Sequence, residues 1–410
     1  MSKTAKIALV GLGERGQCLM RDAILPACEE YSVEVVAVYD TYQDRTELVA
    51  KQVLEKTGKA PIAAKSYDEI LSNPEISGVI IATAWEMHVP MAISAMKAGK
   101  FPAIEVGGAY VVEDCWKLVD TYEETGVPLM FLENCCYGKW ESMVLNMVHR
   151  GVLGEIVHCS GGYHHDLREE IAGGQKNRHY RLRNYINRNC ENYPTHELGP
   201  IAKVLDINNG NRMVSLTSTA SCAKGMHAYL LEKEGANGSF ANVEFAQGDV
   251  VTTVIKCAKG QTIVLTLDTT LPRAYNRCFT VRGTKGGYFG TNNMVFEQGV
   301  HEEFEWEENK LWGNAEAYFE KYAHPLFENY DPKGGHGGMD YLVISAYMES
   351  LVNGTLPPID VYDAAAWMSI TALSEESIVK GGAPVAIPDF TRGKWYVKKE
   401  VTDSKFDLNR

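Results

Sequence analysis

Residues 193–200, YPTHELGP, gather side chains that can hydrogen-bond or move protons at the start of an expected helix. Pro194 restricts the backbone between Tyr193 and Thr195, and His196 precedes the helix-like run that follows. Histidine titrates near neutral pH, and tyrosine can act as a base when cations lower its pKa, so His196 and Tyr193 are candidates for proton transfer. The alternative is structural, with Thr195 as the helix N-cap and Tyr193 as a hydrophobic staple.

A second segment with chemical meaning is GLGERG, residues 11–16, which lies between a buried-strand run and an apolar-periodic helix. Gly11 permits a tight turn, Gly13 lets the backbone approach a pyrophosphate, and Gly16 allows close packing of helix on strand. The next strand, VEVVAVYD, ends at Asp40, 24 residues after Gly16. A dinucleotide site has an acidic residue about 20 residues on, where it binds the ribose hydroxyls and repels a 2′-phosphate. These features predict a site for NAD rather than NADP.

The elements around this segment alternate between strand and helix through the first third of the chain. Further strand runs are expected at 76–83, 102–106 and 128–134. The alternation predicts an α/β fold with a doubly wound parallel Rossmann sheet, in which ligands bind beyond the carboxyl ends of the strands. Three clusters follow strand ends and are expected at that edge: TAWEMH (83–88), EVGG (105–108) and ENCCYG (133–138).

From about residue 150 the pattern changes to strand runs separated by turns, which predicts a second α/β domain with a large open, mostly antiparallel sheet. Helices are expected at 196–208, 339–354 and 363–382, and the glycine-rich loop KGGHGG, residues 333–338, precedes the second of these. For the histidine of that loop, a place in a flexible lid and a substrate contact both stay open.

The length of 410 residues suits two domains. We predict an NAD-binding Rossmann domain over residues 1–136 and a substrate-binding and oligomerisation domain over residues 137–410.

Composition restricts the partners and the cellular compartment. The formal net charge of −13 argues against nucleic acid or an anionic membrane as the main partner. There is no apolar run near 18 residues and the N-terminal sequence lacks the features of a secretory signal, so we expect a cytoplasmic protein, or one whose leader was trimmed. Ten scattered cysteines without a CxxC motif fit reduced thiols.

Other catalytic chemistries find no support in the sequence. His164 and His165 lack a third ligand at the usual spacing, so no metal site is expected. Neither a serine nucleophile elbow nor an HExxH motif is present.

The order of a Rossmann domain, a domain on an open antiparallel sheet and a late DAxxx…ES…GG helix resembles the Gfo/Idh/MocA family over nearly the whole chain. Most members are NAD(P)-dependent sugar or polyol dehydrogenases, which typically have EKP after the fifth strand and a histidine on the first helix of the second domain. Here Val106 stands in place of that lysine and Ile201 in place of that histidine. Neither side chain can take the hydroxyl proton as hydride leaves.

One branch of this family shares these departures: the chain resembles the NAD-dependent glycosidases of glycoside hydrolase family 109, similar to α-N-acetylgalactosaminidase. The shared segments are EV (105–106), ENCCYG (133–138), RLRNYINRN (181–189), YPTHELGP (193–200) and GHGGMD (335–340).

The resemblance implies two sets of site residues in addition to the three glycines. Those that would contact NAD are Glu14, Arg15, Asp40, Trp85 through His88, Glu105, Val106 and Asn134. Those that would contact the sugar are Tyr163, Arg181, Tyr193, Pro194, Thr195, His196 and Tyr275.

The resulting hypothesis is a glycosidase that oxidises its sugar transiently at C3 and uses a tightly bound NAD regenerated in every cycle. His196, Tyr193 and Tyr137 are the candidate catalytic residues, and Arg181 or Arg183 could supply the positive charge that activates a tyrosine. A small-molecule glycoside is the expected substrate, and we expect a homo-oligomer. The alternatives are an NAD-dependent sugar or polyol dehydrogenase, and an inactive sensor that binds NAD and sugar.

Overall fold

The computed structural model describes residues 4–240, 242–304, 313–328 and 330–409. The chain forms two compact units, each made of two segments. The first unit contains Met1–Gly138 and Asn329–Ala365, and the second contains Lys139–Glu328 and Ala366–Arg410. Each unit is described by itself.

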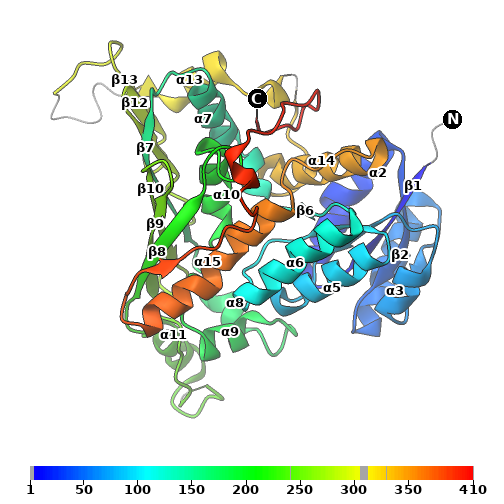
Figure 1. Ribbon diagram of the computed structural model, residues 1–410. Helices are drawn as coiled ribbons and strands as arrows, with labels where there is room; N and C mark the ends of the chain where they lie inside the picture. Colours follow the sequence, from blue (N-terminus) through cyan, green and yellow to red (C-terminus); the bar gives the residue numbers. More distant parts are fainter. Residues whose placement is uncertain (1–3, 241, 305–312, 329, 410) are drawn as a thin grey trace. The chain divides into compact units, whose positions relative to one another are not determined.

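The first unit is built on a parallel sheet of six strands in the order β3-β2-β1-β4-β5-β6 (Figure 1). Apart from Lys6 near the start of β1, the central strands consist of apolar residues with no polar alternation, as expected where helices cover both faces. The strand order reverses between β1 and β4, which is where ligands bind in such sheets. The predicted doubly wound Rossmann sheet is therefore confirmed. The strands are β1 Ala5–Val10, β2 Val33–Tyr39, β3 Ile62–Ala63, β4 Gly78–Ile81, β5 Phe101–Ile104 and β6 Met130–Phe131.

Helices follow the strands of this unit in the expected alternation. The helix after β1 begins as α1 Glu14–Leu19, passes through the π-helical turn η1 Met20–Ile24 and continues as α2 Leu25–Tyr31. The others are α3 Gln43–Thr57, α4 Tyr67–Ser72, α5 Trp85–Lys97, α6 Val112–Thr125 and the 3-10 turn η2 Asn134–Tyr137.

A late segment of the chain completes the first unit. The 3-10 turn η4 His336–Gly338 leads into α14 Met339–Asn353, which packs against η1, α2 and η2. The hydroxyl of Tyr347 on α14 donates a hydrogen bond of 2.8 Å to the carbonyl of Phe101 in β5, and the two rings meet edge to face. The helix predicted over 339–354 is confirmed. That it belongs to the same unit as the Rossmann sheet was not predicted.

The second unit contains a nine-stranded sheet in the order β14-β13-β12-β11-β7-β10-β9-β8-β15. All neighbours are antiparallel except β7 and β10, which are parallel, so the prediction of a mostly antiparallel sheet is confirmed. The strands are β7 Ile156–His164, β8 Met213–Ala220, β9 Val250–Cys257, β10 Thr262–Asp268, β11 Thr280–Gly283, β12 Gly286–Phe289, β13 Met294–Glu297, β14 Gly313–Asn314 and β15 Val385–Ala386.

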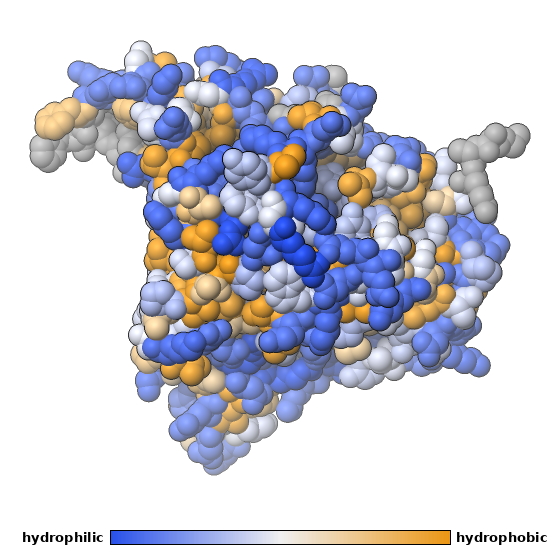
Figure 2. Space-filling view, in the orientation of Figure 1, coloured by the Kyte–Doolittle hydropathy of each residue, from blue (hydrophilic) through white to orange (hydrophobic). Residues whose placement is uncertain are grey.

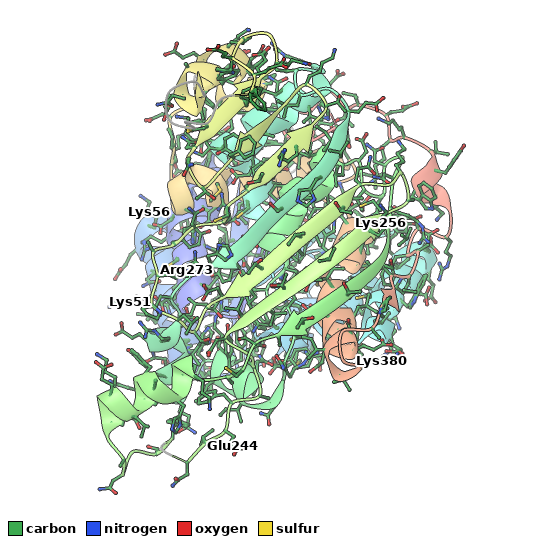
Figure 3. All side chains as sticks on the ribbon, turned by 90° about the vertical axis from the view of Figure 1, so that its left-hand side faces the viewer. Lys51, Lys56, Glu244, Lys256, Arg273 and Lys380 are labelled. Carbon is green, nitrogen blue, oxygen red and sulfur yellow. The ribbon has the colours of Figure 1, made fainter. Side chains whose placement is uncertain are left out.

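One face of this sheet is packed and the other is open. Burial alternates along β9 and β10, which is typical of a sheet with one solvated face. On the packed face, α10 Thr195–Val204 lies against β7 and β10, and α7 Lys139–His149 lies beside α10. Figure 3 looks onto the opposite face, which carries Lys256, and within the described ranges no helix crosses it.

The remaining helices of the second unit surround this core. The longest of these is α15 Val361–Val379, whose first residues belong to the first unit and whose remaining residues belong to the second. The others are α8 Arg168–Ala172, α9 Arg181–Asn187, α11 Gly225–Glu234, α13 Ala315–Tyr322 and the 3-10 turns η3 Pro325–Phe327 and η5 Lys394–Tyr396.

The helix at YPTH is shorter than predicted. Asp206 and Asn208 adopt positive φ angles of 54° and 60°, so the helical run cannot reach residue 208. The late helix α15 ends before the left-handed Gly381 and Gly382, slightly earlier than the predicted residue 382.

In the part of the chain that the structure describes, no helix is both long and apolar enough to cross a membrane.

The exposed residues on the side shown in Figure 2 are mainly hydrophilic, with apolar groups scattered among them. All ten cysteines are free thiols, as the sequence indicates.

Candidate active site

In the glycine loop after β1, the backbone packs too closely against neighbouring backbone atoms for side chains to fit at two of the three glycines. Gly11 has a φ of 89°, and a Cβ there would lie 2.5 Å from the carbonyl carbon of Ala82. A Cβ on Gly16 would lie 2.0 Å from the carbonyl oxygen of Gly11. At Gly13, by contrast, the nearest described atom to such a Cβ is a guanidinium nitrogen of Arg45 at 3.6 Å. The loop is therefore closed at Gly11 and Gly16 and open at Gly13.

Asp40 connects the end of β2 to this loop. One carboxylate oxygen accepts a hydrogen bond of 2.6 Å from the backbone N–H of Leu12, and the other accepts one of 2.9 Å from that of Tyr42. The guanidinium of Arg45 lies 3.9 Å away. A carboxylate has about four acceptor positions, so these contacts leave Asp40 able to accept from ribose hydroxyls.

These residues fit a dinucleotide. The side of Gly13 is open, and α1 begins directly after it with no side chain as its cap, so the helix N-terminus presents backbone N–H groups. Asp40 holds the loop in this shape while its charge disfavours a 2′-phosphate.

The TAWEMH segment follows β4 and begins α5. The imidazole of His88 is buried, and its Nε2 lies 3.0 Å from the carbonyl oxygen of Thr83. Burial lowers the pKa of His88 to about 4, so its imidazole is neutral at neutral pH. Trp85 is also buried and lies against Gly107, where an added Cβ would be 2.5 Å from the indole ring. This packing explains the glycine after Val106 in EVGG.

Four of the sequence motifs meet around Asp340 in the first turn of α14. Arg15 from the glycine loop donates to both oxygens of Asp340, at 2.7 and 2.9 Å, and to Glu105 at 2.8 Å. The carboxamide of Asn134 donates to Asp340 at 2.7 Å, and Nδ1 of His336 lies 2.8 Å from it. We call these five residues the Asp340 cluster.

Asp340 was not among the predicted site residues, and His336 was expected either in a flexible lid or at the substrate. The GHGGMD match was the only signal for them, and it carried no indication of a partner. Burial would raise the pKa of Asp340, but the hydrogen bonds from Arg15 and His336 and the charge of Arg15 hold it well below its usual range.

Two further predicted residues of the first unit are buried. Tyr137, the last residue of η2, has no exposed surface, and Val106 is 5% exposed. In the second unit, Ile201 is also fully buried, in the middle of α10. Apolar side chains thus occupy both positions at which the resemblance to the dehydrogenases implied a lysine and a histidine.

The second unit brings the predicted sugar contacts together as a group of rings. The ring of Tyr163 on β7 lies 4.5 Å from that of Tyr193 and 5.5 Å from that of His196, centre to centre. Tyr193 and His196 meet edge to face at 4.8 Å, and Tyr275 lies 6.3 Å from Tyr163. Residues from a strand, a helix start and a loop therefore converge on one place.

His165 also belongs to this group, although it was not among the residues predicted to contact the sugar. Its Nδ1 lies 3.0 Å from the hydroxyl of Tyr163, and its ring lies 5.0 Å from that of Tyr275. Burial and the charge of Arg181 lower the pKa of His165. Alternation was the signal that could have found it, since side chains two residues apart, such as Tyr163 and His165, point to the same side of an extended segment. We call Tyr163, His165, Tyr193, His196 and Tyr275 the aromatic cluster.

Arg181 places a positive charge beside Tyr193. Its guanidinium lies 5.2 Å from the ring centre of Tyr193, and its Nε donates a hydrogen bond of 2.6 Å to Glu170. Although burial would raise the pKa of Glu170, the charges of Arg181 and His179 hold it below its usual value. Arg183, the other cation considered, is exposed.

For Tyr163, the effect of burial exceeds that of Arg181. Burial raises the pKa of Tyr163 well above its usual range, while the charge of Arg181 acts in the opposite direction. Tyr163 therefore stays a neutral hydroxyl.

The structural interpretation of Thr195 as an N-cap is wrong. Pro194 is the cap residue of α10, Thr195 is already inside the helix, and no side chain caps it. The threonine hydroxyl is buried and, among the described residues, has no hydrogen-bond partner. The prediction failed because Pro194 adopts a helical conformation, with φ −73° and ψ −22°, which moves the helix start one residue earlier.

Comparison with known proteins finds two family matches, which follow one another along the chain. Residues 137–397 match the family described as glycosyl hydrolase 109, C-terminal domain. Residues 5–132 match the oxidoreductase family with an NAD-binding Rossmann fold. A relative named α-N-acetylgalactosaminidase, from Tannerella forsythia, is 39% identical over 388 residues, covering 88% of this chain and 82% of its own. The chain belongs to glycosyl hydrolase family 109.

A second relative, a family 109 protein of Parabacteroides distasonis, is 39% identical over 389 residues and covers 88% of this chain and 82% of its own. These matches show a glycosidase of family 109 whose first unit carries the NAD-binding Rossmann fold.

Solved structures share the fold at much lower identity. A levoglucosan dehydrogenase in complex with NADH and levoglucosan has a TM-score of 0.67 and 17% identity, covering 94% of this chain and all of its own. An inositol dehydrogenase homologue from Azotobacter vinelandii has a TM-score of 0.64 and 16% identity, covering 94% of this chain and 98% of its own. Family 109 thus uses the architecture of the Gfo/Idh/MocA dehydrogenases, as the sequence indicated.

Proposed function

We propose that this chain is an NAD-dependent glycosidase that cleaves terminal N-acetylgalactosamine-type glycosides through transient oxidation of the sugar. The name of the Tannerella forsythia relative supports the choice of sugar. The observation that carries the proposal is the aromatic cluster, which places Tyr193 and His196 against Tyr163 and Tyr275. Rings with a few placed polar groups are typical of small-molecule sites.

The redox route explains why no pair of catalytic carboxylates is needed. When bound, NAD+ would accept hydride from C3 of the sugar and return it at the end of the cycle. A ketone at C3 makes the C2 proton acidic, so that its removal expels the leaving group from C1. Water then adds to C1 of the unsaturated ketone, the proton returns to C2, and the net reaction is hydrolysis.

The chain must supply proton transfer at the C3 hydroxyl, at C2 and at the leaving oxygen. His196 and Tyr193 are our candidates, since both belong to the aromatic cluster and the guanidinium of Arg181 lies 5.2 Å from the Tyr193 ring. Tyr137 is the third candidate, in the same 3-10 turn as Asn134 in the first unit.

We further propose that NAD is bound tightly. The reduced form must stay in place until it returns its hydride, because an enzyme that lost NADH in mid-cycle would stop. The purified protein is then expected to carry NAD, measurable by absorbance after acid release.

A panel of nitrophenyl glycosides tests the proposal. The expected result is release of nitrophenol from the N-acetylgalactosaminide without net NADH, together with deuterium incorporation at C2 in heavy water. NADH accumulation with free sugar would instead show a sugar dehydrogenase. Ligand-dependent thermal stabilisation with neither reaction would show a sensor.

We also propose a homo-oligomer that uses the open face of the nine-stranded sheet. Val254 on β9 is on the same face as Lys256 and is 41% exposed, and exposed apolar groups on an uncovered sheet favour association. Light scattering coupled to size exclusion tests this, and a monomer at micromolar concentration would contradict it.

A further inference from the structure

Asp340 has more charged and polar contacts than its position in the sequence suggests. It is 2% exposed, and it accepts two hydrogen bonds from Arg15 and one from Asn134, while His336 lies at 2.8 Å. A buried carboxylate costs several kcal/mol unless it is paired and hydrogen-bonded, and here these donors surround both oxygens. The site is therefore built around a charged Asp340.

Arg15 is held by two carboxylates rather than by one. Its two terminal nitrogens bind the two oxygens of Asp340 side by side, and one of them also binds Glu105. A two-pronged contact of this kind fixes the plane of a guanidinium as well as its position. Glu105 alone would leave the guanidinium free to turn.

The partners of Asp340 come from the edge of the Rossmann sheet. Arg15 is part of the glycine loop, and Asn134 begins η2, three residues after the end of β6. Glu105, the second partner of Arg15, follows β5. All three are predicted NAD contacts. Asp340 joins Arg15 to Asn134, although it stands in a different motif more than 200 residues later in the sequence.

The segment before Asp340 is held in an uncommon backbone conformation. His336 has a φ of 53°, and three of the four nearby glycines, Gly334, Gly337 and Gly338, have φ values of 76°, 64° and 94°. A non-glycine residue in this region costs about 1–2 kcal/mol. The contact of His336 with Asp340 offsets that strain, so the same carboxylate orders both the glycine loop and the GHGG segment.

We propose that Asp340 is a positioning residue of the NAD site, which acts by fixing Arg15 and Asn134. The inference rests on the proposed NAD site and adds a residue that would not touch the dinucleotide itself. Its consequence is that occupancy of the glycine loop depends on the GHGGMD segment.

The test measures how fast NAD leaves the protein. Labelled NAD+ is exchanged into the purified protein carrying Asp340→Asn, Arg15→Gln or both, and thermal unfolding is recorded in parallel. We expect each single variant to speed exchange about tenfold, in the range for groups in one network, and the double variant to match the faster single one. Glu349→Gln, about 13 Å further along α14, removes a carboxylate from the same helix and should leave exchange unchanged.

Two results would overturn the inference: exchange from Asp340→Asn at the wild-type rate, or effects of the two single variants that multiply in the double variant. If Asp340→Asn does not fold, Arg15→Lys takes its place, because lysine keeps the charge but cannot make the two-pronged contact. Wild-type exchange from Arg15→Lys would then overturn it. A wild-type protein that neither retains nor binds NAD would instead contradict the proposed function, which makes the two failures distinguishable.

Discussion

The Asp340 cluster and the aromatic cluster are held together by opposite kinds of contact. In the first, one arginine, two carboxylates, a carboxamide and an imidazole are joined by hydrogen bonds of 2.7 to 2.9 Å. In the second, rings meet at 4.5 to 6.3 Å between centres, with Arg181 beside them. Paired charges stabilise the first cluster, and packing between rings stabilises the second. A substitution that keeps the shape of a side chain but removes its charge should therefore disturb the first cluster more than the second.

The largest effect is expected from breaking the aromatic cluster at its proton-transfer groups. His196→Ala or Tyr193→Phe should lower turnover at least ~100-fold, in the range for general acid–base catalysis, and leave retained NAD unchanged. Turnover on a nitrophenyl glycoside and acid-released NAD measure the two properties. Tyr396→Phe is the matched control, because that ring is 78% exposed. Near-normal rates in both variants would remove these residues from the mechanism.

In the first unit, pH provides a way to weaken the structure without mutation. The pKa of His88 is lowered from 6.5 to about 4 by burial, so between these values the unfolded chain binds the extra proton. The contribution of neutral His88 is therefore complete above about pH 6.5 and is lost as pH falls, by about 2 kcal/mol between pH 7 and pH 5. Urea unfolding at the two pH values should show this loss in the wild type and a smaller one in His88→Gln. Equal losses would show that another group is responsible.

A steric change in the glycine loop should have a similar or smaller effect, confined to the first unit. In Gly16→Ala the new methyl group would lie 2.0 Å from the carbonyl of Gly11, so the loop must move. We expect a loss of about 1–3 kcal/mol in unfolding free energy, together with loss of retained NAD. Calorimetry and NAD content measure these. Unchanged NAD retention would show that the close packing at Gly16 does not shape the cofactor site.

The smallest effect is expected at the exposed edge of the aromatic cluster. Tyr275 is 49% exposed and its hydroxyl accepts a hydrogen bond of 3.2 Å from Arg277. Tyr275→Ala should raise KM about 2–10-fold, as for the loss of one aromatic contact, with kcat changed less than about twofold. Steady-state kinetics decide this, and a fall in kcat with unchanged KM would place Tyr275 in the chemical step instead.

Structural features that depend on residues close together in the sequence could be predicted from it. The strands of the Rossmann sheet and the turn at Gly11 follow from local apolar runs and glycine spacing. The strands β14 and β15 were missed because two residues each are too short for a pattern, and their pairing comes from the rest of the sheet.

Parts of the candidate site could not be predicted for a different reason. Asp340 and Arg15 are 325 positions apart, and no periodicity links residues at that separation. His165 joins the aromatic cluster only because Tyr163, Tyr193 and Tyr275 converge in three dimensions. At Thr195 the local rule for caps gave the wrong result, since proline at the preceding position already has helical angles.

The late helix α14 has a consequence for how the protein is made. The first unit needs residues 329–365, which leave the ribosome long after residue 138. Proteins are synthesised at about 5–20 residues per second, so the partners of Asp340 wait for tens of seconds before that carboxylate exists. Loading of the nucleotide is therefore expected to be a late event in biosynthesis, and a chain interrupted after its Rossmann strands should emerge without a cofactor.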